Sequence, residues 1–193
     1  MEIRKLNDMR EVLADKDFAQ KSPDIDLYYM YRAIKTNGLS GQDELRYDKT
    51  VLNPQMLGNE FNKTKGHYHI DAYPEIYIVL EGTAIYLLQK RNKQGDIEDV
   101  YAVTVKKGEC AIMPPFYGHV TINPSKTEDL KMANWISDNC KSNYSPYIEK
   151  QGACYYYTQN GWIKNPNYKN TPELRFEKPL KEIPQDLEFL KIG

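Results

Sequence analysis

Histidine and cysteine are scarce in this sequence, and each scarcity limits what the protein can be. The 193 residues include only three histidines and three cysteines. Cys110, Cys140 and Cys154 are odd in number and lack the spacing of a zinc site, so we expect reduced thiols, with Cys110 in the core. The sequence therefore indicates neither a disulfide framework nor a cysteine-based metal site.

An excess of charge of one sign and a long apolar segment are also missing. Twenty-six Lys and Arg residues stand against 27 Asp and Glu residues, which gives a net charge of −1. This balance provides no field that would attract nucleic acid or an anionic membrane. No apolar run reaches the ~20 residues that span a bilayer, and the first residues lack the apolar core of a secretory signal. We therefore expect a cytoplasmic protein with no nucleic-acid or membrane partner.

Short strand patterns separated by turns dominate the sequence. An initial helix is predicted over residues 7–18, with Asn7 as a possible cap, and a turn is predicted over residues 35–42. Gly82 suits a tight turn that needs a positive φ. Strands are expected at residues 24–34, 46–52, 75–80, 83–90, 100–105, 110–113, 119–123 and 130–136. This pattern is typical of an all-β sandwich or barrel.

All three histidines fall where one metal site could use them. His67 and His69 point to the same face if they lie in an extended strand, and their side chains are then about 6 to 7 Å apart. Glu75 and His119 follow in neighbouring strand patterns. Three imidazoles and one carboxylate would leave open positions on a divalent ion, which suits chemistry better than scaffolding. The alternative is a chance His-x-His pair and an ordinary loop histidine.

Two spaced motifs carry a resemblance to a known family. His67-x-His69, Glu75 and Gly82 form the first motif, and Gly108, Pro114, His119 and Asn123 form the second. The pair resembles the two motifs of the cupin superfamily. The flanking residues over about residues 4–136 look like those of the cupin-type phosphoglucose isomerases: Thr64-Lys65-Gly66 before His67, Ile76-Tyr77 after Glu75, Gln89, and Pro114-Pro115-Phe116-Tyr117-Gly118 before His119.

The resemblance implies a fold and an assembly. It implies a cupin double-stranded β-helix, a jelly-roll barrel, with a short N-terminal helix and a C-terminal extension. We expect one domain over residues 1–193, divided into a helix and strands at 1–50, a barrel core at 51–136 and the extension at 137–193. A homodimer is also implied, and the tyrosine-rich β surface would suit such an interface.

The resemblance also implies an activity, namely the metal-dependent interconversion of glucose 6-phosphate and fructose 6-phosphate. His67, His69, Glu75 and His119 would hold one divalent ion per subunit: Fe, Mn, Ni, Co or Zn. Glu75 is the candidate catalytic base, although a metal-bound carboxylate is a poor base, so a role as ligand only stays open. The substrate-binding residues would be Tyr28, Thr50, Thr64, Gly66, Tyr77 and Tyr144, and Lys65 could add charge for the phosphate.

Three departures from the family pattern bear on substrate choice. The gap between His69 and Glu75 is one residue shorter than expected for the archaeal members, and it contains Pro74. Phe116 stands where tyrosine is common, which would remove a hydroxyl from the barrel mouth. A family segment containing histidine is replaced by residues 141–144.

Two other functions remain compatible with the sequence. One is a different cupin enzyme, such as another sugar-phosphate isomerase or a metal-dependent dioxygenase, because the fold and metal set do not fix the reaction. The other is a non-catalytic cupin that binds sugar phosphates, for which we would expect tight binding without interconversion.

Overall fold

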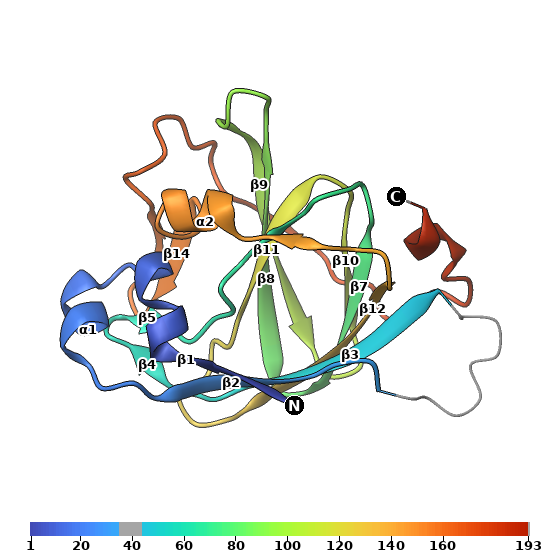
Figure 1. Cartoon of the computed structure of the whole chain (residues 1–193), viewed down its shortest axis with the longest axis horizontal. Coiled ribbons are helices and arrows are strands. Elements are labelled where there is room, and N and C mark those ends of the chain that lie inside the picture. The colour runs from blue at the N-terminus through green and yellow to red at the C-terminus, as the bar shows by residue number, and fades with distance from the viewer. Residues whose placement is uncertain (35–43, 193) are drawn as a thin grey trace.

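Strands arranged in two main sheets form the body of the protein. The computed structural model describes residues 1–34 and 44–192, and Figure 1 shows the sheets facing each other around a barrel. The larger sheet has the order β1-β2-β3-β12-β7-β10 and the smaller one β11-β8-β9-β16. These strands are β1 (Glu2–Lys5), β2 (Asp26–Tyr31), β3 (Leu45–Leu52), β7 (Glu75–Glu81), β8 (Thr83–Arg91), β9 (Ile97–Lys106), β10 (Cys110–Met113), β11 (Tyr117–Ile122), β12 (Leu130–Ser137) and β16 (Arg175–Glu177).

The connections between the sheets are those of a jelly roll. From β7 to β12 the chain crosses between the two sheets four times, and only β8 and β9 follow each other within one sheet. The segment before β6 (Tyr68–His69) extends the smaller sheet, because isolated bridges pair Lys63 with Ile122 and His67 with His119. The predicted all-β cupin barrel is therefore confirmed.

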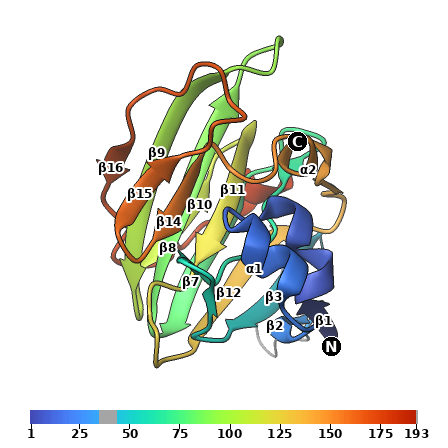
Figure 2. The ribbon, with the colours of Figure 1, turned by 90° about the vertical axis from the view of Figure 1, so that its left-hand side faces the viewer.

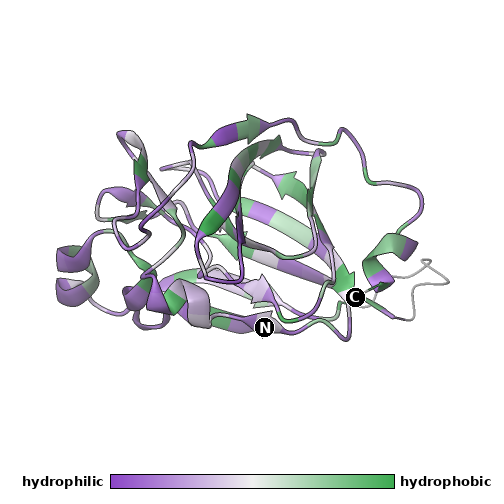
Figure 3. Cartoon of the chain, turned by 90° about the horizontal axis from the view of Figure 1, so that it is seen from above, coloured by the Kyte–Doolittle hydropathy of each residue, from purple (hydrophilic) through white to green (hydrophobic). Residues whose placement is uncertain are grey.

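The barrel interior holds the main hydrophobic core. Tyr86, Leu87 and Leu88 of β8 are completely buried, as is Tyr147 in the short helix α2 (Ser145–Glu149). Figure 3 shows hydrophobic residues gathered along the barrel strands and hydrophilic residues along α1 (Lys16–Lys21) and the outer loops. The three cysteines are free, as expected; Cys110 is buried as predicted, and Cys140 and Cys154 are buried as well.

The predicted helix over residues 7–18 is wrong. Two 3₁₀ turns, Leu6–Asp8 and Arg10–Val12, occupy most of this range, and the α-helix begins only at Lys16, after the Asp15 side chain accepts a hydrogen bond from the Phe18 amide. The buried side chains Leu6, Met9 and Val12 recur at intervals of three. An interval of three places them on one side of a 3₁₀ helix, so packing against the barrel favours the tighter turn.

The eight strands predicted from the sequence are all present, with ends shifted by a few residues. One such difference is at β9, which begins three residues earlier than predicted, at Ile97. Gly82 has φ of 81°, as its predicted turn requires. The turn predicted over residues 35–42 lies outside the described residues.

Segments after β12 pack on the outside of the barrel, where they pair with β9 and with a short strand that precedes β6. A small sheet has the order β15-β14-β5-β4, formed by β4 (Met56–Leu57), β5 (Glu60–Phe61), β14 (Tyr155–Thr158) and β15 (Gly161–Lys164). Figure 2 shows β16 running along β9, with which it pairs in parallel. The final 3₁₀ helix, Glu188–Lys191, buries Leu190 in a second cluster beside Trp135. None of the described helices is long and apolar enough to span a membrane.

Candidate metal centre and its cavity

Three strand segments bring the four predicted ligands together. His67 and His119 are paired across neighbouring strands, because each backbone amide donates to the other's carbonyl, at 3.3 and 3.0 Å. His69 follows two residues later on the same face, and Glu75 begins β7 in the opposite sheet. One ligand atom from each of the four residues lies within 4.8 Å of the others. The four side chains therefore lie close enough together to share one ion.

The atoms that face one another are buried and lack hydrogen-bond partners. Oε2 of Glu75 is 3.4 Å from Nε2 of His69 and 3.3 Å from Nε2 of His119. All three atoms are buried and unsatisfied in the described part of the chain. Unpaired buried polar atoms are costly, and a divalent ion bound by imidazole and carboxylate would satisfy them together. These residues therefore fit a metal ion.

The charge states of three of the four ligands suit the same role. Burial lowers the pKa of His67 well below its ordinary value, and the nearby His119 and His69 lower it further. Burial also lowers the pKa of His119. Burial opposes ionisation of Glu75, but contacts with His119 and His69 outweigh it and hold the pKa of Glu75 well below its ordinary value. Neutral imidazoles and an ionised carboxylate are the forms that bind a metal. His69 differs, because burial opposes its ionisation but contacts with Cys140 and Glu75 outweigh burial and raise the pKa of His69 to about 10, so a bound ion would have to displace its proton.

The shortened loop between His69 and Glu75 supports the site. Nδ1 of His69 lies 2.6 Å from the Tyr73 carbonyl oxygen. A carbonyl oxygen can only accept, so Nδ1 carries the proton and Nε2 is left free to face Glu75. The tight path of this loop thus fixes the tautomer and the orientation of one ligand.

The candidate metal ligands border a small cavity of about 80 Å³ between the sheets. Its wall includes three of the four ligands, His67, Glu75 and His119, whereas His69 lines the neighbouring outer hollow. All six predicted substrate-binding residues line this cavity: Tyr28, Thr50, Thr64, Gly66, Tyr77 and Tyr144. The structure thus brings together residues that are as much as 116 positions apart in the sequence (144 − 28).

Thr64 and Gly66 are built into the cavity wall. The Thr64 hydroxyl oxygen accepts a hydrogen bond of 2.9 Å from the Thr121 amide, which leaves its own proton for another acceptor. Gly66 has φ of 80°, and a Cβ there would lie 2.6 Å from Val120 and 2.7 Å from the Tyr147 ring. Only glycine fits this position without displacing its neighbours.

Three tyrosines surround the same space. The Tyr28 hydroxyl accepts a hydrogen bond of 3.3 Å from the Lys65 amide, and burial raises the pKa of Tyr28 to about 12. The Tyr144 ring centroid is 5.4 Å from that of His67. The Tyr77 ring centroid is 5.8 Å from that of His119. Burial opposes ionisation of Tyr28 and Tyr77 and raises the pKa of each, so their neutral hydroxyls can both donate and accept.

Sequence reasoning did not assign a group of charged residues in the wall. Arg32 and Arg46 line the cavity, and both form ion pairs of 2.9 Å with the buried Asp48. Arg32 follows Tyr28 by four residues, which places both on one face of an extended chain, and this spacing is a signal that the sequence offers. Ser142 and Cys140 also line the cavity, within or beside the segment that replaces the family histidine.

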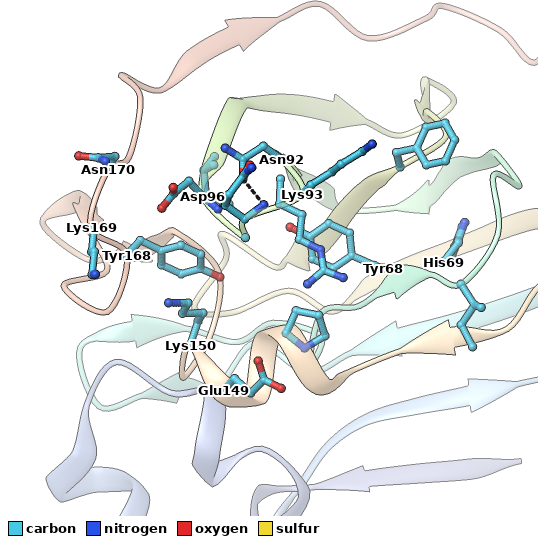
Figure 4. A pocket seen from close by; sticks show the side chains of 17 residues that line it. Tyr68, His69, Asn92, Lys93, Asp96, Glu149, Lys150, Tyr168, Lys169 and Asn170 are labelled. Carbon is cyan, nitrogen blue, oxygen red and sulfur yellow. Dashed lines mark hydrogen bonds between the residues drawn. The ribbon is translucent and has the colours of Figure 1, made fainter.

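A larger hollow of about 850 Å³ lies outside the barrel and is shown in Figure 4. Its wall includes Tyr168, Lys150 and Asp96, and His69 lies at its edge. Phe116 lines this outer hollow rather than the metal cavity, and it is 63% exposed with φ of 67°. Phe116 therefore does not line the metal cavity itself, and the expectation that it removes a hydroxyl from the barrel mouth stays a prediction.

Comparison with solved structures finds similar barrels. An oxalate oxidase in complex with glycolate is 18% identical with a TM-score of 0.46, and the match covers 62% of this chain and 55% of that chain. A vicilin from hazelnut (Corylus avellana) is 14% identical with a TM-score of 0.44, and the match covers 61% of this chain and 31% of that chain. The matched part of this chain thus corresponds to about half of the oxalate oxidase chain and about a third of the vicilin chain.

Comparison with known sequences is more specific. A protein named glucose-6-phosphate isomerase from Thermococcus gammatolerans is 36% identical over 70% of this chain and 69% of its own length. Proteins of the same name from Pyrococcus horikoshii and Pyrococcus furiosus are 27% and 29% identical, over 87% and 86% of this chain and 88% and 87% of their own lengths. The family profile described as glucose-6-phosphate isomerase matches residues 3–173, well beyond the 4–136 expected from motifs. The chain belongs to the glucose-6-phosphate isomerase family.

Proposed function

We propose that this protein interconverts glucose 6-phosphate and fructose 6-phosphate with one divalent ion bound by His67, His69, Glu75 and His119. The observation that carries this proposal is the cluster of four buried ligand atoms within 4.8 Å of one another, at the end of a cavity in a member of this family. The reaction moves a carbonyl between C1 and C2 of the sugar. It therefore needs a group that moves a proton and a site that accepts charge on oxygen.

The bound ion would act as a Lewis acid toward the C1 and C2 oxygens. Glu75 is the chain's own candidate for moving the proton between the two carbons. One of its oxygens, Oε2, faces His69 and His119, so the other is available for a substrate atom. Tyr77 lies two residues after Glu75 on the same face of β7, and its hydroxyl would hold that carboxylate in position.

The phosphate end of the substrate would lie against the opposite part of the cavity. We propose that Tyr28, Thr50, Thr64 and the Gly66 amide bind it there, with Lys65 adding positive charge. Thr64 supports this placement because its proton is free to donate, and the positive φ of Gly66 lets the backbone approach a ligand closely. Tyr144 would cover the sugar from the side of His67.

A coupled assay on fructose 6-phosphate, with metal analysis of the same sample, tests the proposal. Turnover should be lost when a chelator removes the metal and should return with at least one of Fe, Mn, Ni, Co or Zn. Unphosphorylated fructose is the matched control and should react much more slowly. Full activity without metal would overturn the metal assignment.

The same assay separates the two alternative functions. Tight binding of fructose 6-phosphate without interconversion, in metal-replete protein, would favour a sugar-phosphate-binding cupin. Turnover of another sugar phosphate but not of this pair would favour a related enzyme. Either result would overturn the proposed reaction while leaving the fold and family unchanged.

A further inference from the structure

We infer that Arg32 and Arg46, joined by Asp48, form an anion-binding subsite at the metal end of the cavity, which binds negative charge at C1 and C2 of a sugar phosphate. The proposed function supplies the orientation of the sugar, on which this inference rests. The ligand class is a phosphorylated sugar acid, an aldonate, whose carboxylate stands where the reacting carbonyl would stand.

The first observation is a buried carboxylate that two arginines share. Asp48 is completely buried, and it accepts hydrogen bonds of 2.9 Å from Nη1 of Arg32, 2.9 Å from Nε of Arg46 and 2.8 Å from the Ala33 amide. Ala33 has φ of 49°, an uncommon value for a residue other than glycine. One carboxylate balances only one of the two guanidinium groups, so the cluster retains a charge of +1.

The second observation is where the cluster lies. Across the large sheet, Ile136 of β12 pairs with Arg46 on one side and with Glu75 on the other. Directly paired residues share a face, so Arg46 and Glu75 stand at the same level, roughly 10 Å apart at the usual strand spacing. Tyr28 lies on β2, and Arg32 follows four residues later, just past the end of that strand. In an extended chain these two residues are roughly 13 Å apart. The cluster therefore lies toward the metal ligands and away from the proposed phosphate position.

The third observation is that the arginines and the metal ligands share one cavity. Arg32, Arg46 and His67 all line it, so an anion held between the two arginines would also be near His67.

The arginines are held ready for a ligand. A guanidinium group has five N–H donors, and Asp48 occupies one donor on each side chain. Nη2 of Arg32 contacts only the Met30 sulfur, at 3.2 Å, within the part of the chain that the structure describes. The side chains are 37% and 25% exposed, so the remaining donors can reach a ligand in the cavity. The planar guanidinium group presents its N–H donors as a fork, which matches the two oxygens of a carboxylate.

The chemistry of isomerisation explains why this position would bind charge. Removing a proton from the carbon next to a carbonyl places negative charge on the C1 and C2 oxygens. An aldonate phosphate carries a full negative charge at the same end of the chain, whereas the corresponding alditol phosphate carries none. Both ligands carry the same phosphate, so its contribution to binding cancels in the ratio of their affinities. That ratio therefore reports on the subsite.

The test is calorimetric titration of the metal-loaded protein with 6-phosphogluconate and with glucitol 6-phosphate. Arg46→Gln should reduce the aldonate-to-alditol affinity ratio by about tenfold or more, the usual effect of losing hydrogen bonds to a charged group. Arg32→Gln should reduce it similarly. Lys49→Gln is the matched control, because Lys49 is on the same strand but contacts the Tyr47 ring outside the cavity, and it should leave the ratio unchanged.

Metal content and thermal unfolding are measured on every sample, so that a loss of fold or metal is recognised. Arg46→Lys keeps the charge but not the fork, and it should retain part of the aldonate preference. An unchanged ratio in folded, metal-loaded Arg46→Gln and Arg32→Gln would overturn the subsite even if the protein is an active isomerase. A reduced ratio in a protein without isomerase activity would support the subsite and overturn only the proposed reaction.

Discussion

Glu75 has two candidate roles, metal ligand and proton carrier, which one substitution can separate. Glu75→Gln keeps the size and an oxygen donor but removes the charge and nearly all basicity. Three imidazoles remain to hold the ion. If Glu75 moves the proton, as we propose, turnover of fructose 6-phosphate should fall by about 10²- to 10⁴-fold at full metal occupancy. The measurement is a coupled assay at saturating metal.

Metal content must be determined on the same samples, because a weaker site would also lower activity. Tyr77→Phe is a useful companion variant, since it removes the hydroxyl that we propose holds Glu75 but leaves the carboxylate in place. It should reduce turnover much less than Glu75→Gln. Full activity of metal-saturated Glu75→Gln would limit Glu75 to the role of a ligand.

The sequence revealed the residues with distinctive chemistry and missed those with ordinary chemistry. Rare histidines at fixed spacings were enough to single out His67, His69 and His119 as candidate ligands. Arg32, Arg46 and Asp48 went unassigned because alternating charged residues on a strand usually indicate a solvated face. Only the pairing of β2 with β3 and of β3 with β12 turns these side chains inward and buries Asp48.

At the scale of elements, an ion pair attaches β16 to the barrel. Arg175 donates two hydrogen bonds to Asp99, at 3.0 and 2.7 Å, and its guanidinium lies 4.5 Å from the Tyr101 ring centroid. The Tyr117 hydroxyl also donates to Asp99, at 2.6 Å. The hydrogen bonds with Arg175 are the main cause that lowers the pKa of Asp99. A carboxyl group with a lowered pKa in the folded protein stabilises the fold only when it is ionised.

Asp99→Asn should therefore lower the free energy of unfolding at neutral pH, by about 1 kcal/mol, because the pair is partly exposed and screened by solvent. The contribution is fully present above the ordinary aspartate pKa of about 4 and is lost as the pH falls through the lower folded pKa. Wild-type and variant proteins should thus converge in stability below about pH 3. Urea unfolding at pH 7 and at acid pH measures the difference.

Glu81→Gln is the matched control, because Glu81 pairs with Lys131 on an exposed surface. It should change stability less than Asp99→Asn at pH 7. A difference between wild type and Asp99→Asn that stays constant with pH would show that the loss comes from packing rather than charge.

Elements with a strong repeating pattern were predictable, and short elements that depend on packing were not. The strands β7, β8 and β10 follow runs of apolar residues bounded by turns, so their ends were predicted closely. The prediction of the first helix failed because its apolar residues recur at intervals of both three and four. Contact with the barrel selects the interval of three, which is that of a 3₁₀ helix. β16 is three exposed residues, and only its pairing with β9 makes it a strand.

At the scale of the whole molecule, the large sheet ends in an edge strand that suits an interface. Among the described residues, β1 lies at the edge of the six-stranded sheet, and Ile3 and Tyr31 on β1 and β2 are 38% and 39% exposed. An edge strand beside exposed apolar side chains favours pairing with a second copy of the chain. We therefore expect a homodimer that uses this edge.

Light scattering at micromolar concentration should give about twice the 22.5 kDa mass of the chain. Tyr31→Glu places a charge on the proposed interface and should shift the protein toward the monomer, because a buried unpaired charge is costly. Phe176→Glu is the control: Phe176 is 66% exposed on β16, away from the β1 edge, and its substitution should leave the mass unchanged. A monomer mass for the wild-type protein would rule out the dimer. A dimer unaffected by Tyr31→Glu would place the interface on another face.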